Sequence, residues 1–304
     1  MTRALLCSGQ GRVEREMFDL LAQNRRARAV FQAAAEQLGR DPVAFLEEAS
    51  ATELIEDRTG QILSVARALA AGASLEIDAP TMIAGYSVGE MAAWSLAGIW
   101  APGRVLRLTS RRAELMELAD GGIGGLGFVR GLDDRVLGDL LVRHGCAIAI
   151  RNPGRMYIIG GVRDDIARCC AAALGLGAAG ARPIPVRVAS HTSRLQGAVD
   201  PFLRILTGEP AARPDAKVTL IGAADASIVT NPEESLEGLA RQVATTIDWN
   251  GVLTALVERG ARRFLELGPG NALADMVRTG WPDLEVRSFD DFRTVEGAGQ
   301  WFDA

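Results

Sequence analysis

Lysine is nearly absent from this sequence. Lys217 is the only one, and arginine supplies the rest of the positive charge. The net charge is −5, and the basic residues are spread along the chain rather than gathered into a stripe. Because proteins that bind nucleic acids carry clustered positive charge, we expect no nucleic acid partner.

Long apolar runs are also missing. The longest stretches without a charged residue are 91–103 and 169–181, which fall short of the roughly 18 to 20 apolar residues that a membrane span requires. The first apolar run ends by Gly9 and is too short for the core of a signal peptide. We therefore expect a cytoplasmic protein without a membrane helix. Its 304 residues suffice for one large core or two smaller ones.

Cysteine and histidine are too sparse for a metal centre. The four cysteines include no Cys-x-x-Cys pair, and only His144 and His191 could add ligands. We therefore expect reduced, mostly buried thiols, and neither a metal nor a redox cofactor. The cysteines are Cys7, Cys146, Cys169 and Cys170.

Strand and helix patterns alternate along most of the chain, which predicts a parallel sheet covered by helices on both faces. Glycine-rich turns at 8–11, 85–87 and 268–270 follow three of the predicted strands. Strands are predicted at 3–7, 81–84, 218–221 and 263–267, and helices at 52–72, 88–99, 102–118, 192–206, 233–245 and 252–258.

The pattern changes between about 121 and 189, where it predicts the order β-α-β-β-α-β, the ferredoxin-like unit. The predicted strands are 124–129, 146–150, 156–159 and 184–188, and the helices are 133–143 and 164–174. We therefore predict an α/β fold with an α/β-hydrolase-like large domain, residues 1–120 and 190–304. A ferredoxin-like subdomain, residues 121–189, is inserted into it.

The sequence Gly85-Tyr86-Ser87-Val88-Gly89 lies between a predicted strand and a predicted helix. Gly-x-Ser-x-Gly in that context is the nucleophile elbow, a tight turn that exposes the serine hydroxyl above the sheet. The following helix N-terminus favours negative charge near Ser87. A structural Gly-Ser turn is the alternative interpretation.

A serine nucleophile requires a base, and the chain offers two histidines. His191 lies where the inserted unit returns to the main sheet, so it can face Ser87 across a cleft. His144 is predicted at a solvated helix end. His191 is therefore the candidate base, with a structural role as its alternative.

Five motifs, in this order and spacing, resemble those of the malonyl-CoA:acyl carrier protein transacylase family along nearly the whole chain. They are Gly9-Gln10-Gly11, Gly85-Tyr86-Ser87-Val88-Gly89-Glu90, Arg112 with Met116, Ser190-His191, and Glu266-Leu267-Gly268-Pro269-Gly270. The resemblance implies the same architecture, an α/β domain with a ferredoxin-like insertion.

The resemblance also implies roles for particular residues. Ser87 would attack the thioester carbonyl of an acyl-CoA, either malonyl-CoA or a related carboxyacyl-CoA, and His191 would take the proton of Ser87. The backbone N–H groups of Gln10 and Val88 would form the oxyanion hole. The acyl group would then pass to the phosphopantetheine thiol of an acyl carrier protein in a ping-pong reaction. Arg112 would bind the free carboxylate of the malonyl group.

Other assignments are less specific. Arg112 lies on a predicted helix with acidic neighbours, so a surface ion pair is an alternative for it. In the family a backbone carbonyl orients the histidine, and its expected source here is near Asp248. Gln61 and Asn152 resemble polar residues near the family's pocket, although either could cap a turn or a helix. Tyr86 replaces the common histidine before the nucleophile.

Two other functions stay open. An ordinary α/β-hydrolase shares Gly-x-Ser-x-Gly, but its histidine normally lies near the C-terminus, and this chain has no His-Gly-Gly run. The second is a catalytically weak subunit that docks a carrier protein in a larger assembly. Malonate decarboxylase includes a transacylase subunit of this kind, and stand-alone acyltransferases serve polyketide synthases.

Overall fold

Two five-stranded sheets organise the protein in the computed structural model, which describes residues 2–11 and 13–304. The larger sheet is parallel throughout, with the strand order β10-β9-β1-β2-β7. Its strands are β1 (Thr2–Cys7), β2 (Thr81–Gly85), β7 (Val218–Ile221), β9 (Ala261–Glu266) and β10 (Glu285–Ser288).

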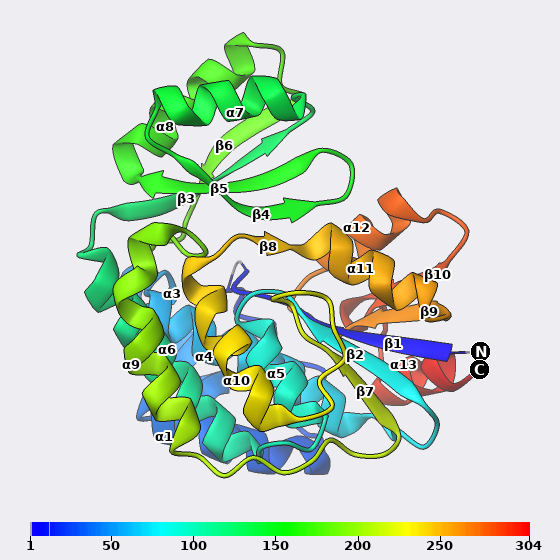
Figure 1. Ribbon diagram of the computed structural model, residues 1–304. Coiled ribbons are helices and arrows are strands. Elements are labelled where there is room, and N and C mark those ends of the chain that lie inside the picture. The colour runs from blue at the N-terminus through cyan, green and yellow to red at the C-terminus, as the bar shows by residue number, and fades with distance from the viewer. Residues whose placement is uncertain (1, 12) are drawn as a thin grey trace.

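Helices cover both faces of the larger sheet (Figure 1). Side chains that alternate along its strands enter two different cores, with Leu5 and Ile83 on one face and Leu6 and Ala84 on the other. The first face packs against α1 (Arg28–Leu38), α4 (Asp57–Ser74), α5 (Gly89–Leu96), α6 (Pro102–Asp120), α9 (Gln196–Thr207), α10 (Pro232–Arg241) and α13 (Val295–Asp303). The second packs against α11 (Trp249–Glu258) and α12 (Ala272–Gly280).

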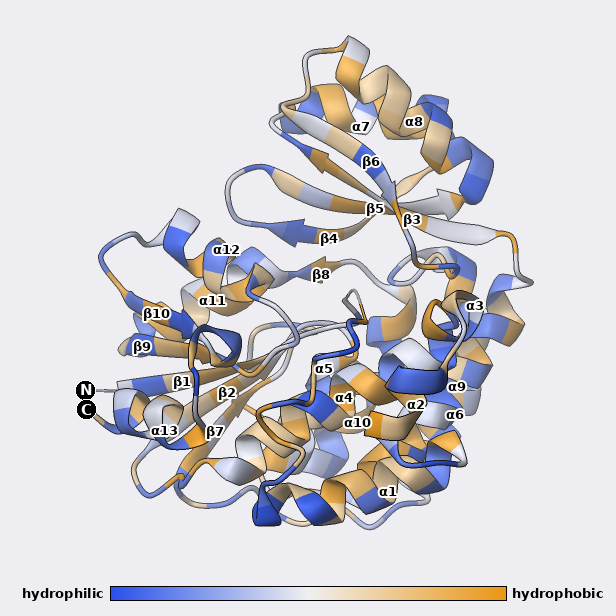
Figure 2. Ribbon diagram, turned by 180° about the vertical axis from the view of Figure 1, so that it is seen from behind, coloured by the Kyte–Doolittle hydropathy of each residue, from blue (hydrophilic) through white to orange (hydrophobic). Residues whose placement is uncertain are grey.

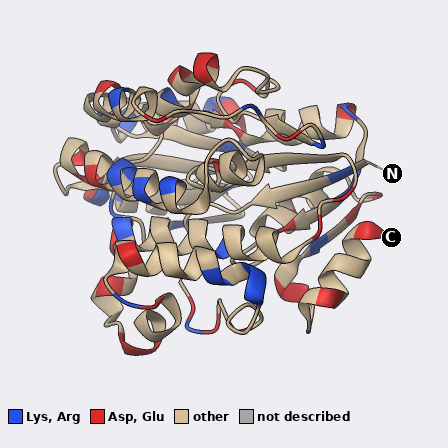
Figure 3. Ribbon diagram, turned by 90° about the horizontal axis from the view of Figure 1, so that it is seen from below, with Lys and Arg blue, Asp and Glu red and all other residues tan. Residues whose placement is uncertain are grey.

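Hydropathy follows this layering. The strands of the larger sheet are mostly hydrophobic, whereas the helices over them alternate hydrophobic and hydrophilic residues (Figure 2). Such amphipathic helices bury one stripe and expose the other. Positive and negative residues are interspersed on the elements seen from below (Figure 3). Among the described residues, no helix is both long and apolar enough to cross a membrane.

The inserted unit has the predicted β-α-β-β-α-β order and stands above the larger sheet (Figure 1). In its sheet β3 pairs antiparallel with β5 and with β6, and β5 pairs antiparallel with β4, which gives the ferredoxin-like order β6-β3-β5-β4. Its elements are β3 (Gly124–Arg130), α7 (Asp134–Arg143), β4 (Ala147–Asn152), β5 (Met156–Val162), α8 (Arg163–Gly175) and β6 (Gly180–Ile184).

A strand from outside the insertion completes this smaller sheet. β8 (Ile247–Asp248) pairs in parallel with β4, so the two parts of the molecule share a sheet. The fold class predicted from the sequence is confirmed. The domain boundaries at 120 and 189 stay a prediction.

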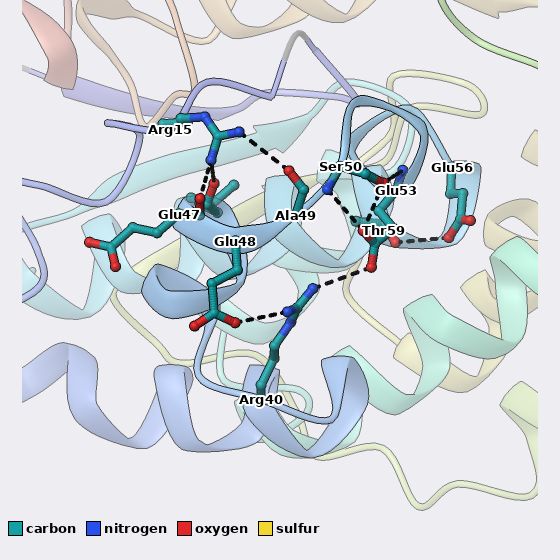
Figure 4. A network of polar contacts seen from close by, with 10 residues as sticks. Arg15, Arg40, Glu47, Glu48, Ala49, Ser50, Glu53, Glu56 and Thr59 are labelled. Atoms are coloured by element: carbon teal, nitrogen blue, oxygen red, sulfur yellow. Dashed lines mark hydrogen bonds and ion pairs between the residues drawn. The ribbon is translucent and has the colours of Figure 1, made fainter.

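Two predicted elements differ from the structure. The helix predicted over 52–72 is two helices, α3 (Ala51–Leu54) and α4. The backbone at Glu56, between them, is extended and interrupts the helix. Ser50 and Glu53 form a capping box that starts α3 separately. Figure 4 shows this capping box beside the α2 (Pro42–Glu48) segment, which Arg15 and Arg40 hold through further hydrogen bonds.

The second difference is β6, predicted at 184–188 but found four residues earlier. Residues 185–189 instead form tight turns, in which the N–H groups of Val186 and Ser190 donate to carbonyls two residues back. β6 is an edge strand of its sheet, a position that tolerates the missing N–H of Pro183. The turns carry the chain from the insertion to His191.

Candidate active site

The nucleophile elbow joins the carboxyl end of β2 to the start of α5. Ser87 has a φ of 55°, a left-handed conformation that a non-glycine residue rarely adopts and that is typical of functional sites. The Tyr86 N–H donates to the Cys7 carbonyl at 2.9 Å, which ties the turn to the end of β1. Both strands therefore end at the same edge of the sheet, where ligands of parallel sheets bind.

The two glycines of the motif allow the backbones to approach. A Cβ at Gly85 would lie 2.2 Å from the Glu90 backbone nitrogen, and one at Gly89 would lie 2.2 Å from the Cys7 carbonyl oxygen. Neither backbone neighbour can move without opening the elbow. A side chain is therefore excluded at both positions.

We expect Gly89→Ala to destabilise the protein by about 3 kcal/mol, because overpacking against a fixed backbone displaces the start of α5 from the end of β1. Urea denaturation measures the free energy of unfolding. Gly138→Ala is the matched control: Gly138 lies within α7 and a Cβ there meets nothing within 4 Å, so it should stabilise by about 0.5–1 kcal/mol. A Gly89→Ala protein as stable as the wild type would contradict the packing argument.

Ser87 and His191 come together from distant parts of the sequence. Ser87 Oγ lies 2.7 Å from His191 Nε2, and His191 Nδ1 lies 2.6 Å from the backbone carbonyl oxygen of Gln242. A carbonyl only accepts hydrogen bonds, so Nδ1 carries the proton and the neutral ring leaves Nε2 as the acceptor for the Ser87 hydroxyl. This is the tautomer that a general base requires.

His191 is held neutral by its surroundings. Its side chain is buried, and burial followed by the positive charge of Arg112 lowers the pKa of His191 to about 3, against the opposing hydrogen bond to Gln242. His191 also has a φ of 60°, so both members of the pair occupy strained backbone positions. The imidazole is therefore ready to accept a proton at neutral pH.

Gln10 directly follows Gly9, which lies close to Ser87, and Val88 is the next residue after Ser87. A Cβ at Gly9 would lie 3.5 Å from Ser87 Cβ, which places the turn after β1 beside the elbow. Within the described residues, neither the Gln10 nor the Val88 N–H donates a hydrogen bond. Two unused donors beside a serine hydroxyl could stabilise an oxyanion.

Arg112 lies inside the molecule rather than on the surface. It is 2% exposed, which is incompatible with the surface ion pair considered as its alternative. Its Nη1 donates to Gln61 Oε1 at 2.6 Å, and Gln61 Nε2 donates to Asp57 Oδ2 at 2.6 Å. Gln61 thus links the guanidinium to a buried carboxyl group on α4.

A second amide links Arg112 to another buried carboxyl group. Arg112 Nη2 donates to Gln242 Oε1 at 3.5 Å, and Gln242 Nε2 donates to Glu90 Oε2. Gln242 therefore touches Arg112 with its side chain and His191 with its carbonyl. Arg112 makes no direct ion pair among the described residues, so its N–H groups contact only neutral amides.

Burial dominates the electrostatics of this cluster. It lowers the pKa of Arg112 to about 10 and raises those of Asp57 to about 6 and Glu90 to about 7. The attraction between Arg112 and the two carboxyl groups opposes each shift. Arg112 stays protonated at neutral pH, and a planar guanidinium binds a carboxylate through two parallel N–H donors.

The insertion contributes Asn152 to the site. Asn152 is buried at the end of β4, close enough to the Tyr86 hydroxyl to oppose the raised pKa that burial gives Tyr86. Neither amide atom of Asn152 makes a well-formed hydrogen bond to a described residue. The Tyr86 ring packs edge-on against Trp249, with the centroids 5.2 Å apart. Asn152 thus lies beside the elbow, and Gln61 lies beside Arg112.

The prediction for Asp248 is wrong. Asp248 is exposed, and its side chain accepts a hydrogen bond from the Gly251 N–H at the start of α11. The carbonyl that orients His191 belongs instead to Gln242, in the short 3-10 helix η3 (Gln242–Ala244) after α10. Nothing in the local sequence marks a carbonyl for this role, because any residue can supply one.

Sequence reasoning also missed Asp57, Glu90 and Gln242 as parts of the Arg112 cluster. Glu90 directly follows the Gly-x-Ser-x-Gly motif, so a carboxylate on the inner face of the elbow helix was a usable signal. Asp57 lies near the start of a helix, where an acidic residue is ordinarily explained by the helix dipole. Only the tertiary structure shows that both are buried against one arginine.

Comparison with known proteins gives consistent relatives, although no protein-family profile matches the chain. The chain is 31% identical over 248 residues to the polyketide biosynthesis protein ThaF of Burkholderia thailandensis, and 27% identical over 300 residues to the malonyl CoA-acyl carrier protein transacylase of a Synechocystis species. These matches span 79% and 97% of the chain, but 21% of ThaF and 100% of the Synechocystis protein.

Solved structures agree along the whole chain. The acyl-carrier-protein S-malonyltransferase of Burkholderia pseudomallei superposes with a TM-score of 0.89 at 27% identity, covering 99% of this chain and all of the other. A malonyl-transacylase solved in complex with a type II polyketide synthase acyl carrier protein superposes with a TM-score of 0.90 at 25% identity, covering 99% of each chain. Along its whole length this chain is therefore similar in sequence and fold to malonyl-CoA:acyl carrier protein transacylases.

Proposed function

We propose that the protein transfers a malonyl group from coenzyme A to the phosphopantetheine thiol of an acyl carrier protein through an ester on Ser87. The observation that carries this proposal is the pairing of two features at one residue. Gln242 orients the base of the Ser87–His191 pair with its carbonyl and contacts the buried Arg112 with its side chain. A nucleophile and a carboxylate-binding cation are therefore built around the same segment.

In the first half-reaction Ser87 Oγ attacks the thioester carbonyl, and its proton moves to His191 Nε2. A new C–O bond forms, and the carbonyl oxygen becomes an oxyanion that the Gln10 and Val88 N–H groups stabilise. The intermediate collapses by breaking the C–S bond, and the CoA sulfur leaves with the proton from His191. The Gln242 carbonyl holds the ring throughout and stabilises its charged form.

In the second half-reaction a carrier thiol takes the place of CoA. His191 Nε2 removes the thiol proton, the sulfur attacks the seryl ester, and Ser87 regains its proton as the C–O bond breaks. The related transacylase solved with its polyketide synthase acyl carrier protein supports this class of partner. The substrates are thioesters on both sides, so the reaction requires neither a metal nor a redox cofactor.

Arg112 supports malonyl as the acyl group. Each terminal nitrogen of a guanidinium carries two N–H groups, and Nη1 and Nη2 each use one on an amide oxygen. One donor on each nitrogen is left for a substrate carboxylate, the bidentate geometry that arginine favours. An acetyl group has no carboxylate to accept hydrogen bonds from these two donors.

The two other functions are less well supported. An α/β-hydrolase orients its histidine with a carboxylate, whereas a carbonyl faces His191 Nδ1 here. A subunit that only docks a carrier would not need the aligned Ser87–His191 pair. We also propose a cytoplasmic location, which suits the four free cysteines.

Intact-protein mass spectrometry tests the proposal. After mixing with malonyl-CoA, we expect one malonyl adduct on the wild type and none on Ser87→Ala, because only the serine ester traps the acyl group. Addition of a carrier protein bearing phosphopantetheine should then remove the adduct and leave a malonylated carrier. Methylmalonyl-CoA and acetyl-CoA serve as competing donors. A folded wild type that acquires no adduct and turns over simple esters would favour the hydrolase instead.

A further inference from the structure

When both of its acids are ionised, the Arg112 cluster holds more negative charge than one arginine balances. Asp57 and Glu90 are each 2% exposed and are the two carboxyl groups whose charges act on Arg112. A malonyl carboxylate at Arg112 would be a third anion around one cation in a region of low dielectric. Like charges brought together in such a region drive one of the acids to take up a proton.

Asp57 differs from Glu90 in how its oxygens are used. Both oxygens of Glu90 accept hydrogen bonds, one from Gln242 and one from the Ala223 N–H at 3.1 Å. Asp57 Oδ2 accepts from Gln61, and the Gln10 side chain also lies close to the carboxyl group, whereas Oδ1 is buried without a well-formed hydrogen bond to any described residue. Glu90 has the higher pKa in the empty site, but a proton on Glu90 would displace a donor, whereas a proton on Asp57 Oδ1 breaks no well-formed hydrogen bond.

On this basis, and resting on the proposed function, we propose that Asp57 is a specificity-determining residue. When a carboxyacyl group binds to Arg112, the Asp57 carboxylate takes up one proton from solvent, so the charge of the substrate replaces that of Asp57. An acyl group without a carboxylate binds with no such uptake. Asp57 thereby makes the preference for malonyl over acetyl depend on pH.

The groups that face Asp57 set the pH range. On its own helix Gln61 bonds to it, and from α6 it faces Arg112 and Glu117. Gln10, from the turn after β1, also contacts its carboxyl group. A cavity of about 350 Å³ beside Asp57 is lined by further charges of both signs, from Glu56, Glu117, Asp120, Arg163 and Arg187. This cavity offers a path for a proton from solvent.

The sign of the effect follows from the empty site. There the pKa of Asp57 is about 6, so at pH 7 the carboxyl is mostly ionised and must gain a proton before the malonyl group binds. Affinity for malonyl-CoA should therefore be constant well below pH 6 and fall about tenfold per pH unit above it. Affinity for acetyl-CoA should not follow this curve, and CoA phosphates affect both ligands equally.

Isothermal titration calorimetry in buffers of different ionisation enthalpy measures the protons taken up on binding. Ser87→Ala protein keeps each thioester intact during the titration. At pH 7 we expect malonyl-CoA to bind with about one more proton taken up than acetyl-CoA. In the Ser87→Ala protein, the further substitution Asp57→Asn introduces a side chain that is neutral at every pH. It should abolish the difference in proton uptake between the two ligands and tighten malonyl-CoA binding at pH 8 by at least tenfold. Glu117→Gln is the matched control and should keep the difference.

The outcomes separate the two proposals. Equal proton uptake with malonyl-CoA and acetyl-CoA would overturn the role of Asp57, and this comparison needs no change at Asp57. A difference that persists in Asp57→Asn would also overturn it and assign the proton to Glu90. If the wild type forms the Ser87 adduct in mass spectrometry, either result leaves the proposed function standing. If it forms no adduct, the proposed function fails, and the inference fails with it.

Discussion

Replacing His191 with alanine is expected to slow the acylation of Ser87 by malonyl-CoA by about a thousandfold, within the 10²–10⁴ range typical of a general base. The reason is geometric: His191 Nε2 is 2.7 Å from Ser87 Oγ, and the described structure offers no other base within hydrogen-bond reach of that oxygen. Rapid mixing followed by mass spectrometry measures the rate. His144→Ala is the control, because His144 ends α7 in the insertion and should acylate normally.

The pH profile gives an independent check on His191. At saturating malonyl-CoA the binding step drops out, and the acylation rate reports the protonation of the base. Because the pKa of His191 is lowered to about 3, the base stays in its active neutral form down to about pH 4. We therefore expect no acid limb between pH 5 and 7. A limb near the ordinary histidine pKa would contradict the burial argument.

The parts of the site that the sequence predicted are those built by short segments. The role of Ser87 was predicted from a strand, a tight turn and a helix, which all lie within about twenty residues of one another. His191 was predicted as the base by elimination, because the chain has only two histidines. The alternation of strands and helices likewise predicted the layering, because burial on both faces of a parallel sheet leaves a strong mark on composition.

The parts that were missed depend on contacts between distant segments. The carbonyl that orients His191 comes from 51 residues away, and the carbonyl of every residue looks alike in a sequence. Asp57 and Glu90 are 33 residues apart along the chain, yet both act on Arg112. Burial of a charge is a property of the folded packing, so no local pattern distinguishes these acids from exposed ones.

Replacing Arg112 with alanine is expected to lower the rate of malonylation by roughly 30-fold to several thousand-fold. Truncating one partner of a buried, hydrogen-bonded charge pair costs about 2–5 kcal/mol. Here Arg112 is the partner that is truncated, and the substrate carboxylate is the one left unpaired. Acetylation should change far less, because acetyl has no carboxylate. Adduct formation from malonyl-CoA and acetyl-CoA, measured side by side, gives the ratio. Arg111→Ala, which removes an exposed neighbour paired with Glu114, should leave the ratio unchanged.

The same substitution should alter stability in a way that depends on pH. Without the cation, burial raises the pKa values of Asp57 and Glu90 further above those of the unfolded chain, so the folded state binds more protons than the unfolded state. Its stability must then fall as pH rises. We expect Arg112→Ala to lose stability between pH 5 and 8 more steeply than the wild type, and Arg112→Ala with Asp57→Asn to recover part of it. The free energy of unfolding is measured at several pH values for both proteins. If it falls equally steeply with pH for the wild type and Arg112→Ala, then Arg112 does not hold these carboxyl groups ionised.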